Sequence, residues 1–214
     1  MTDLYVIGEP SGGKAMIEDK AKGTDENLKA GEIARMDIGH EGLRLAAVRE
    51  DELPLLLSLF NEHEAAGFYV PTMVRPYNLE QLRGMLADWN DRSESFLFAI
   101  RNREELVGIA NIDGFSWPNA HAEIGIALAS PRYRGQGFAS KALKILLDYL
   151  FLEVGLHRVY CRIMAGNEAS MRLFLRMGFR EEGIMRSHIR RRGTYLDMHL
   201  FGMLADEWIG SSKA

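Results

Sequence analysis

Hydrophobic and polar residues follow regular spacings from Leu43 onward, and the spacing changes several times between the period of a strand and that of a helix. Short apolar or alternating runs predict strands at 43–48, 96–100, 106–112, 122–128, 158–163, 179–189 and 195–204. Apolar stripes at intervals of three and four residues predict helices at 51–62, 78–89, 137–154 and 168–177. Strands and helices in this order predict an α/β (α+β) fold, a mixed sheet with helices on both faces.

Residues with known capping preferences mark several of the predicted helix ends. Asp51 is of a type that caps helix N-termini, and Asn78 followed three residues later by Gln81 forms a capping-box pattern. Gly155 and Gly178 stand where the last two helices should stop. The polar turns at 101–105 and 190–193 separate neighbouring strands, so we expect two hairpins.

The first forty residues differ from the rest of the chain. They contain many Gly, Lys, Asp and Glu residues and few large apolar ones, so we expect an N-terminal extension of unknown role at 1–40 and one domain at 41–210. A short strand at 4–7 is expected within the extension. Residues 8–15 nearly match a Walker phosphate loop, but Ala15 stands where the magnesium-binding hydroxyl is needed. We therefore expect a flexible turn there.

Composition and charge restrict the classes of protein that remain. The 214 residues are 47% apolar and 26% charged, which is ordinary for a globular protein. No window approaches the ~18 consecutive apolar residues of a membrane span. The N-terminus lacks a secretory pattern and Cys161 is the single cysteine, so we expect a cytoplasmic protein. The net charge of −4, and a basic turn at 190–192 without surrounding aromatic residues, argue against nucleic acid as a partner. No histidine stands at a spacing suited to a metal site.

The segment Ser130–Ser140, with the sequence SPRYRGQGFAS, carries the strongest indication of a binding site. It lies between a predicted strand and the longest predicted helix, whose first-turn N–H groups and partial positive charge suit a phosphate. Glycine residues in it let the backbone approach an anion closely, and Arg132 and Arg134 add positive charge. We therefore interpret the segment as a cradle for a pyrophosphate.

Several phosphate-binding motifs can be compared with this loop. The dinucleotide pattern G-x-G-x-x-G fails at Ser140, and a Walker loop would need Lys followed by Ser or Thr after its last glycine. The pattern Q/R-x-x-G-x-G/A matches twice, from Arg132 to Gly137 and from Arg134 to Ala139. We prefer the second match because it places Gly137 at the start of the helix.

Segments on both sides of the loop resemble the GNAT superfamily of acetyltransferases. The matching segments are Ala122–Leu128, Asn167–Phe179 and an ending that runs from Glu182-Gly183 through Gly193–Asp197 to Glu207-Trp208. The resemblance covers residues 43–208 and is closest to the branch of spermidine acetyltransferases and of enzymes that acetylate ribosomal-protein N-termini. It implies a GNAT fold, whose mostly antiparallel central sheet is splayed at the cofactor site.

The resemblance also assigns cofactor contacts by position. It implies acetyl-CoA as the acyl donor, with the pantetheine arm along the end of the strand at 122–128 and the pyrophosphate on the loop. Asn167 would bond the pantetheine or cysteamine portion, and the same side chain would cap the next helix. The cofactor-binding residues implied are Ala127, Leu128, Ala129, Arg134, Gly135, Gln136, Gly137, Phe138, Ala139, Ser140, Asn167 and Phe174.

Acyl transfer to an amine needs a proton acceptor for the amine and N–H donors for the oxyanion. In many relatives a tyrosine protonates the leaving thiolate, but this chain has Phe174 there, so we consider Ser170 as a substitute. Ser170 can also be read as a small residue that fits under the cofactor, and a thiolate can leave without an acid. For the base we favour Glu123, against the alternative of an ordinary solvated carboxylate. Weaker candidates are His121, Glu62 and Glu64.

Residues and resemblance together predict an acetyl-CoA-dependent N-acetyltransferase that moves an acetyl group to a primary amine by direct attack in a ternary complex. The acceptor would be a polyamine-like small molecule or a protein N-terminus, in a cleft between the first two helices and the final hairpin. Dimers are common among relatives, so a homodimer is a further expectation. The alternative is a non-catalytic acyl-CoA-binding sensor, which Phe174 suggests.

Overall fold

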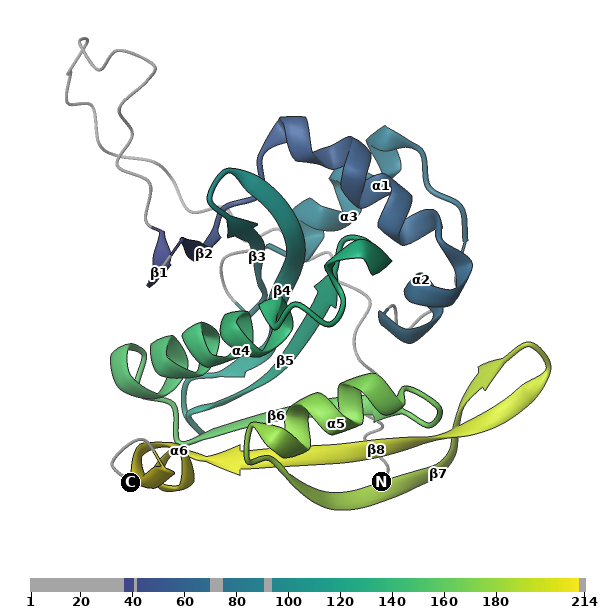
Figure 1. The fold of residues 1–214 in the computed structure, drawn as a ribbon. Helices are drawn as coiled ribbons and strands as arrows, with labels where there is room; N and C mark the ends of the chain where they lie inside the picture. Colours follow the sequence, from purple (N-terminus) through teal and green to yellow (C-terminus); the bar gives the residue numbers. More distant parts are fainter. Residues whose placement is uncertain (1–36, 41, 70–74, 91–93, 212–214) are drawn as a thin grey trace, which may run out of the picture. The chain divides into compact units, whose positions relative to one another are not determined.

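The computed structural model describes residues 37–40, 42–69, 75–90 and 94–211 (Figure 1). All of them belong to one unit, Asp37–Ala214. The strand predicted at 4–7 and the turn predicted at 8–15 lie outside the described residues.

An eight-stranded sheet runs through this unit in the spatial order β1-β2-β3-β4-β5-β6-β8-β7. Neighbouring strands are antiparallel except β5 and β6, which are parallel. The predicted mixed, mostly antiparallel sheet is therefore confirmed. The strands are β1 (Ile38–His40), β2 (Leu43–Ala46), β3 (Phe96–Asn102), β4 (Glu105–Ser116), β5 (His121–Leu128), β6 (Arg158–Met164), β7 (Arg180–Arg191) and β8 (Thr194–Leu204).

Helices pack on both faces of the sheet, as predicted. In Figure 1, α4 and α5 lie on the near face of the sheet. The helices are α1 (Leu53–Asn61), α2 (His63–Tyr69), α3 (Leu79–Asp88), α4 (Phe138–Asp148), α5 (Glu168–Arg176) and α6 (Ala205–Ser211), with 3₁₀ turns at Glu50–Glu52 and Pro131–Tyr133.

Strand alternation divides the buried side chains into two cores on opposite faces of the sheet. On β4, Ile109 packs in the core that holds α1 and α3, whereas Ala110 and Ile112 pack in the core that holds α4 and α5. On β5, Ile124 lies on the α4 side and Ala127 on the α1–α3 side. Odd-numbered residues of β5, and of β4 from Ile109 to Asp113, therefore face α1–α3, and this parity decides which polar side chains can meet.

The capping box predicted at α3 is confirmed. Asn78 Oδ1 accepts from the Gln81 amide at 2.8 Å, and Gln81 Oε1 accepts from the Asn78 amide at 3.0 Å. The cap predicted at Asp51 is wrong. Glu50–Glu52 instead forms a 3₁₀ turn, and α1 begins at Leu53 with Pro54 in its first turn, where a missing N–H costs nothing. The turn is closed by Glu52, whose carboxylate accepts from the Arg49 amide at 2.7 Å.

Other boundaries differ from the prediction for identifiable reasons. The strand predicted to reach residue 48 ends at Ala46, because the Ala47 carbonyl accepts from the side chain of Arg101 rather than from a backbone N–H of β3. The helix predicted to reach 154 changes at Tyr149 to a π-helical turn, Tyr149–Glu153, which ends at Gly155 with the expected positive φ of 78°. Three elements were not predicted: β1, α2 and α6. Because β1 pairs with β2, residues 38–40 belong to the sheet although the predicted boundary follows residue 40.

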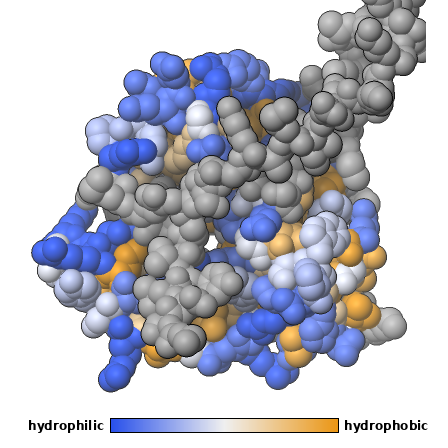
Figure 2. Space-filling view, turned by 180° about the vertical axis from the view of Figure 1, so that it is seen from behind, coloured by the Kyte–Doolittle hydropathy of each residue, from blue (hydrophilic) through white to orange (hydrophobic). Residues whose placement is uncertain are grey.

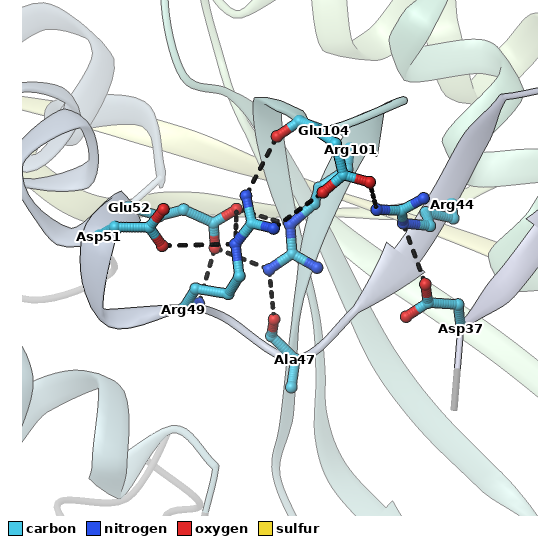
Figure 3. Close-up of polar contacts among 8 residues, drawn as sticks. All are labelled: Asp37, Arg44, Ala47, Arg49, Asp51, Glu52, Arg101 and Glu104. Atoms are coloured by element: carbon cyan, nitrogen blue, oxygen red, sulfur yellow. Dashed lines mark hydrogen bonds and ion pairs between the residues drawn. The ribbon is translucent and has the colours of Figure 1, made fainter. Parts of the chain in front are cut away.

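A charged network fixes the segment between β2 and α1 (Figure 3). At its centre lies a buried ion pair between Arg101 of β3, 1% exposed, and Glu52, 5% exposed. Arg101 Nε lies 2.6 Å from Glu52 Oε1, and Arg101 Nη2 lies 2.8 Å from Oε2. Around it, Arg49 and Arg44 both bind Glu104 at the turn between β3 and β4. The network ties the β3–β4 hairpin to the start of α1.

The surface is mostly polar where the second view shows it. On the described residues in Figure 2, hydrophilic side chains predominate and hydrophobic ones form small separate groups. The large apolar side chains that remain exposed come from different elements and include Trp117, Leu152 and Tyr195. No helix in the described ranges is long and apolar enough to cross a membrane.

Candidate active site

The loop between β5 and α4 has the backbone conformation that an anion site requires. Gly135 and Gly137 have φ of 74° and 78°, in the left-handed region, and Gly137 is the N-cap of α4. No atom lies within 4 Å of a Cβ built on either glycine, so conformation rather than crowding calls for glycine here. Gly137 has no side chain to cap the helix, which leaves the first-turn N–H groups of Phe138 and its neighbours to an external acceptor. The helix start predicted at Gly137 is confirmed.

The two arginines of the loop have different surroundings. Arg132 lies 2.8 Å from Glu105 and stacks over the Tyr133 ring, and its carbonyl accepts from Gln136 at 2.6 Å. Arg134 is exposed, and it has no ion-pair partner within the described part of the chain. Arg134 is therefore the cation that is free to bind a phosphate, in agreement with the motif match that begins at this residue.

The sheet opens between β5 and β6. The two strands pair only through His121↔Arg158, Ala122↔Val159 and Glu123↔Tyr160. Beyond Glu123, β5 continues to pair with β4 as far as Leu128, and β6 continues to pair with β8 as far as Met164. In the described structure, no backbone pairing joins the facing edges of β5 and β6 beyond Glu123 and Tyr160. This is the predicted splay, and it leaves backbone groups of Ala127 and Leu128 for an extended ligand.

The start of α5 lies beyond the end of β6, and Asn167 caps it as predicted. Asn167 Oδ1 accepts from the Ser170 amide at 3.2 Å. Ser170 is partly buried in the first helical turn. Phe174 is only 2% exposed and packs edge-on against Phe179 with a centroid separation of 5.0 Å. Its ring is thus part of the core, and it offers almost no surface to a ligand.

Glu123, the predicted base, lies at the last paired position of β5 and is bound by an arginine. Its two carboxylate oxygens accept from Arg162 Nε at 2.9 Å and Nη2 at 2.7 Å. Both side chains are largely buried, with exposed fractions of 17% for Glu123 and 15% for Arg162. The interpretation of Glu123 as an ordinary solvated carboxylate does not describe this environment.

A polar cluster that was not predicted lies beside Glu123 on the same face of the sheet. Asn111, buried in β4, accepts through Oδ1 from the Tyr69 hydroxyl at 2.6 Å and donates through Nδ2 to Asp113. Asp113 is the cross-strand partner of Glu123. The sequence does contain a signal for this cluster, because Asn111 and Asp113 are two polar residues two positions apart in a strand that is otherwise mostly apolar.

Burial governs the protonation of these groups. Burial raises the pKa of Asp113, the negative charge of Glu123 raises it further, and hydrogen bonds from Ser95 and Asn111 act in the opposite direction. Burial likewise raises the pKa of Tyr69 well above its ordinary value, so its hydroxyl stays neutral and remains a donor. The cluster therefore contains a carboxyl group that binds a proton more readily than a solvated one.

The other candidates are placed less favourably. Glu62 is exposed at the end of α1. His121 lies at the other end of β5, next to the Tyr160 ring. The side chain of Glu64 lies outside the described residues. No group of His, Cys, Asp or Glu side chains in the described ranges could hold a metal ion.

Comparison with known proteins identifies the family. A model of the acetyltransferase (GNAT) domain matches residues 42–180, which include the loop, β5, β6 and α5. The chain therefore belongs to the GNAT family of N-acetyltransferases.

Several relatives cover most of the chain. YoaA, an uncharacterised N-acetyltransferase of Bacillus subtilis (strain 168), is 33% identical over 167 residues, 76% of this chain and 93% of YoaA. The spermidine N(1)-acetyltransferase of Vibrio cholerae serotype O1 is 24% identical over 172 residues, 80% of this chain and 98% of that enzyme. A solved structure of RimL, a ribosomal L7/L12 alpha-N-protein acetyltransferase in complex with coenzyme A, has the same fold. Its TM-score is 0.70 at 22% identity, over 80% of this chain and 99% of that one.

Proposed function

We propose that this GNAT enzyme transfers an acetyl group from acetyl-CoA to a primary amine, by direct attack of the amine on the thioester while both substrates are bound. The observation that carries the proposal is the combination of an open phosphate loop with an open strand edge. The loop at 129–137 leads from β5 to the uncapped start of α4, and β5 is the strand whose inner edge is free from Ile124 to Leu128. One ligand with a diphosphate and an extended amide arm fits both features.

The proposed contacts follow from these two features. The diphosphate would accept hydrogen bonds from the backbone of Gly135–Ser140 and from the side chain of Arg134, at the positive end of the α4 dipole. The pantetheine arm would pair with Ala127, Leu128 and Ala129 as an added strand. Asn167, at the far side of the opening, would bond the end of that arm. Phe174 would support the slot from within the core, since its ring is buried.

The chemical steps of acyl transfer can be assigned to groups around the opening between β5 and β6. A backbone N–H at the free edge of β5 would stabilise the oxyanion of the tetrahedral intermediate. Ser170 is the hydroxyl nearest in sequence to the predicted acid position and would protonate or hydrogen-bond the leaving thiolate. Two carboxylates, Glu123 and Asp113, lie at the closed end of the opening and are available to the amine.

The acceptor is proposed to be a polyamine-like molecule or a protein N-terminus. The spermidine and ribosomal-protein acetyltransferases among the relatives support this choice. Arg191 of the final hairpin donates to the Gly67 carbonyl of α2 at 3.2 Å, so this hairpin reaches the helical side of the sheet on which the acceptor is proposed to bind. The homodimer stays a prediction.

Turnover with a panel of acceptors tests the function. Release of coenzyme A from acetyl-CoA would be followed with polyamines, amino acids, aminoglycosides and N-terminal peptides, with both substrate concentrations varied. We expect turnover on at least one amine, with intersecting double-reciprocal lines that indicate a ternary complex. Parallel lines would contradict direct attack. Tight acetyl-CoA binding without turnover on any amine would favour the acyl-CoA sensor instead.

Two matched loop variants test the cofactor site. Arg134→Gln removes the unpaired cation, and we expect the Kd for acetyl-CoA to rise about 5–30-fold, since one charge-assisted hydrogen bond contributes about 1–2 kcal/mol at a site of this exposure. Arg132→Gln is the control, because Arg132 is already paired with Glu105. Equal effects of the two variants on the Kd would show that Arg134 has no special role.

A further inference from the structure

The structure offers two carboxylates to the acceptor amine, and they differ in how they are bound. Glu123 and Asp113 face each other across β5 and β4. Both belong to the sheet face that packs against α1–α3, as the parity of the strands requires. They also lie at the position where pairing between β5 and β6 ends, which is where the splay begins.

Glu123 is poorly suited to take a proton. One guanidinium binds both of its oxygens, in the fork geometry that gives the strongest arginine–carboxylate pairs. Protonation of Glu123 would break these charge-assisted bonds and leave Arg162 largely buried without its counter-ion. The same contact bridges β5 and β6 directly beyond their last backbone pair. The geometry of the ion pair between Glu123 and Arg162 indicates a structural role, in which it holds the two strands together.

Asp113 is held differently, and it keeps capacity for a proton. It accepts hydrogen bonds from neutral donors, the Asn111 amide and the Ser95 side chain, and it has no bidentate ion pair with any residue that the structure describes. Its side chain is only partly buried, so a ligand can reach it. A carboxylate has about four acceptor positions, so two neutral donors leave room for an ammonium or a water.

Asn111 is fixed in the orientation that presents its NH₂ group to Asp113. An ionised Asp113 carboxylate can only accept, so the amide directs Nδ2 to Asp113 and Oδ1 to the Tyr69 hydroxyl, which donates to it at 2.6 Å. Gly125 supplies the space. A Cβ on Gly125 would lie 2.3 Å from Asn111 Oδ1, so no other residue at this position allows the amide to stay in place. Three elements, α2, β4 and β5, thus cooperate to orient one carboxylate.

The electrostatic surroundings of Asp113 also favour its role as a proton acceptor. Burial raises the pKa of Asp113, and the charge of Glu123 adds to this effect, while Arg162 partly offsets it. A proton acceptor with a raised pKa takes a proton from an ammonium group more readily than an ordinary carboxylate does. The titratable and charged groups around Asp113 are Tyr69 from α2, Glu123 from β5, and Tyr160 and Arg162 from β6.

We propose that Asp113 is the carboxylate that accepts the proton of the acceptor amine, held in place by Asn111 and Tyr69, and that Glu123 and Arg162 form a positioning pair. This inference rests on the proposed function. In the step, Asp113 takes a proton from the ammonium group, directly or through one water, and releases a neutral amine. The nitrogen attacks the thioester carbon, the C–N bond forms and the C–S bond breaks. The second amine proton passes to the leaving thiolate, and Asp113 returns its proton to solvent.

The test compares three variants through the pH dependence of kcat/KM for the amine. Asp113→Asn should lower kcat about 10²–10⁴-fold and abolish the acidic limb of the profile, with an unchanged Kd for acetyl-CoA. Glu123→Gln should lower kcat less than about tenfold and keep the limb. Glu153→Gln, at an exposed position on the π-helical turn, is the matched control and should behave as the unmodified enzyme.

A positioning variant keeps the proposal testable if Asp113→Asn does not fold. Tyr69→Phe removes only the hydroxyl that orients Asn111, so kcat should fall while the Kd for acetyl-CoA stays constant. Because Asp113 then loses the Asn111 hydrogen bond that lowers its pKa, the acidic limb should move to a higher pH. The proposal is overturned if Asp113→Asn keeps at least a third of the activity with its limb intact, or if only Glu123→Gln abolishes the limb. Absence of turnover by the unmodified enzyme on every amine would instead count against the proposed function itself.

Discussion

The ion pair between Glu52 and Arg101 should contribute strong coupling but little net stability. Both side chains are almost completely buried, and among the described residues the one further partner of Arg101 is the Ala47 carbonyl, at 2.6 Å. Glu52→Leu would leave the guanidinium buried with that single acceptor. Removing one partner of a buried pair costs about 3–5 kcal/mol. This is a large part of the 5–15 kcal/mol that is typical of the free energy of unfolding.

Removing Arg101 instead of Glu52 should lower the free energy of unfolding by less, because Glu52 has a second partner. In Arg101→Met, the carboxylate keeps its hydrogen bond from the Arg49 amide at 2.7 Å and the weaker contact with Arg49 Nε at 3.6 Å. We expect a loss of about 2–4 kcal/mol. In the double variant neither charge of the pair remains buried; the Arg49 amide loses its acceptor and the Ala47 carbonyl its donor, so the loss should be about 0–2 kcal/mol.

Urea unfolding measures all three values in one double-mutant cycle. The transition would be followed by far-UV circular dichroism and by tryptophan fluorescence, which should coincide for a two-state transition. The reasoning requires a coupling energy of at least about 3 kcal/mol, with the double variant more stable than Glu52→Leu. If the single effects add to within about 0.5 kcal/mol, the pair does not act as a desolvated unit and the argument fails.

Three further predictions concern separate parts of the fold. Gly137→Ala should lower Tm by roughly 2–4 °C, because a left-handed φ of 78° costs about 1 kcal/mol for alanine, whereas Gly84→Ala in α3 should not lower it. Hydrogen bonds, that from Arg44 foremost, lower the pKa of Glu104 to about 2. The Tm advantage over Glu104→Gln should therefore be full above about pH 5 and vanish as the pH falls toward 2. Burial raises the pKa of the Cys161 thiol well above its ordinary value, so a thiol reagent should label it only after unfolding in urea; rapid labelling of the native protein would contradict its burial.

Local chemistry explains why several elements could be predicted from the sequence. Asn78 and Gln81 are three residues apart and satisfy each other's backbone, so the start of α3 depends on nothing distant. Gly137 and Gly155 have positive φ values where the sequence pattern expects a helix start and a helix end. The apolar stripe at 143–147 was likewise sufficient to predict α4, and its residues Leu143, Leu146 and Leu147 are completely buried.

The missed elements depend on tertiary contacts. Nothing local separates α1 from α2 except an extended backbone at Glu62, with ψ of 108°. The early end of β2 follows from Arg101, which is 54 residues away from the carbonyl of Ala47 that it binds. α6 is short, and its Trp208 ring is anchored by the Asp148 carboxylate at 2.9 Å. Short segments whose partners lie far along the chain give little periodic signal.

The candidate site was predicted well where it consists of backbone and poorly where it consists of side chains. The phosphate loop needs glycines at fixed positions before a helix, and the sequence shows them directly. The pairing of Asn111 with Tyr69 and Asp113 depends instead on α2, which was not predicted, and on the register of β4 against β5. The ion pair of Glu123 with Arg162 depends on where β5 and β6 stop pairing. A strand-by-strand interpretation cannot give that position.

The opening in the sheet and the carboxylates beside it are parts of one arrangement. β5 is held along its outer edge by β4 up to Leu128, and β6 is held along its outer edge by β8 up to Met164, so neither strand needs the other beyond Glu123. The contact of Arg162 with Glu123 joins the two strands with side chains at the point where the backbone ladder stops. The phosphate loop follows the open end of β5, and Asp113 lies at the closed end. In the proposed binding mode, an extended arm that enters from the loop would therefore carry its reacting end toward the carboxylates, between two strands that the fold anchors from outside.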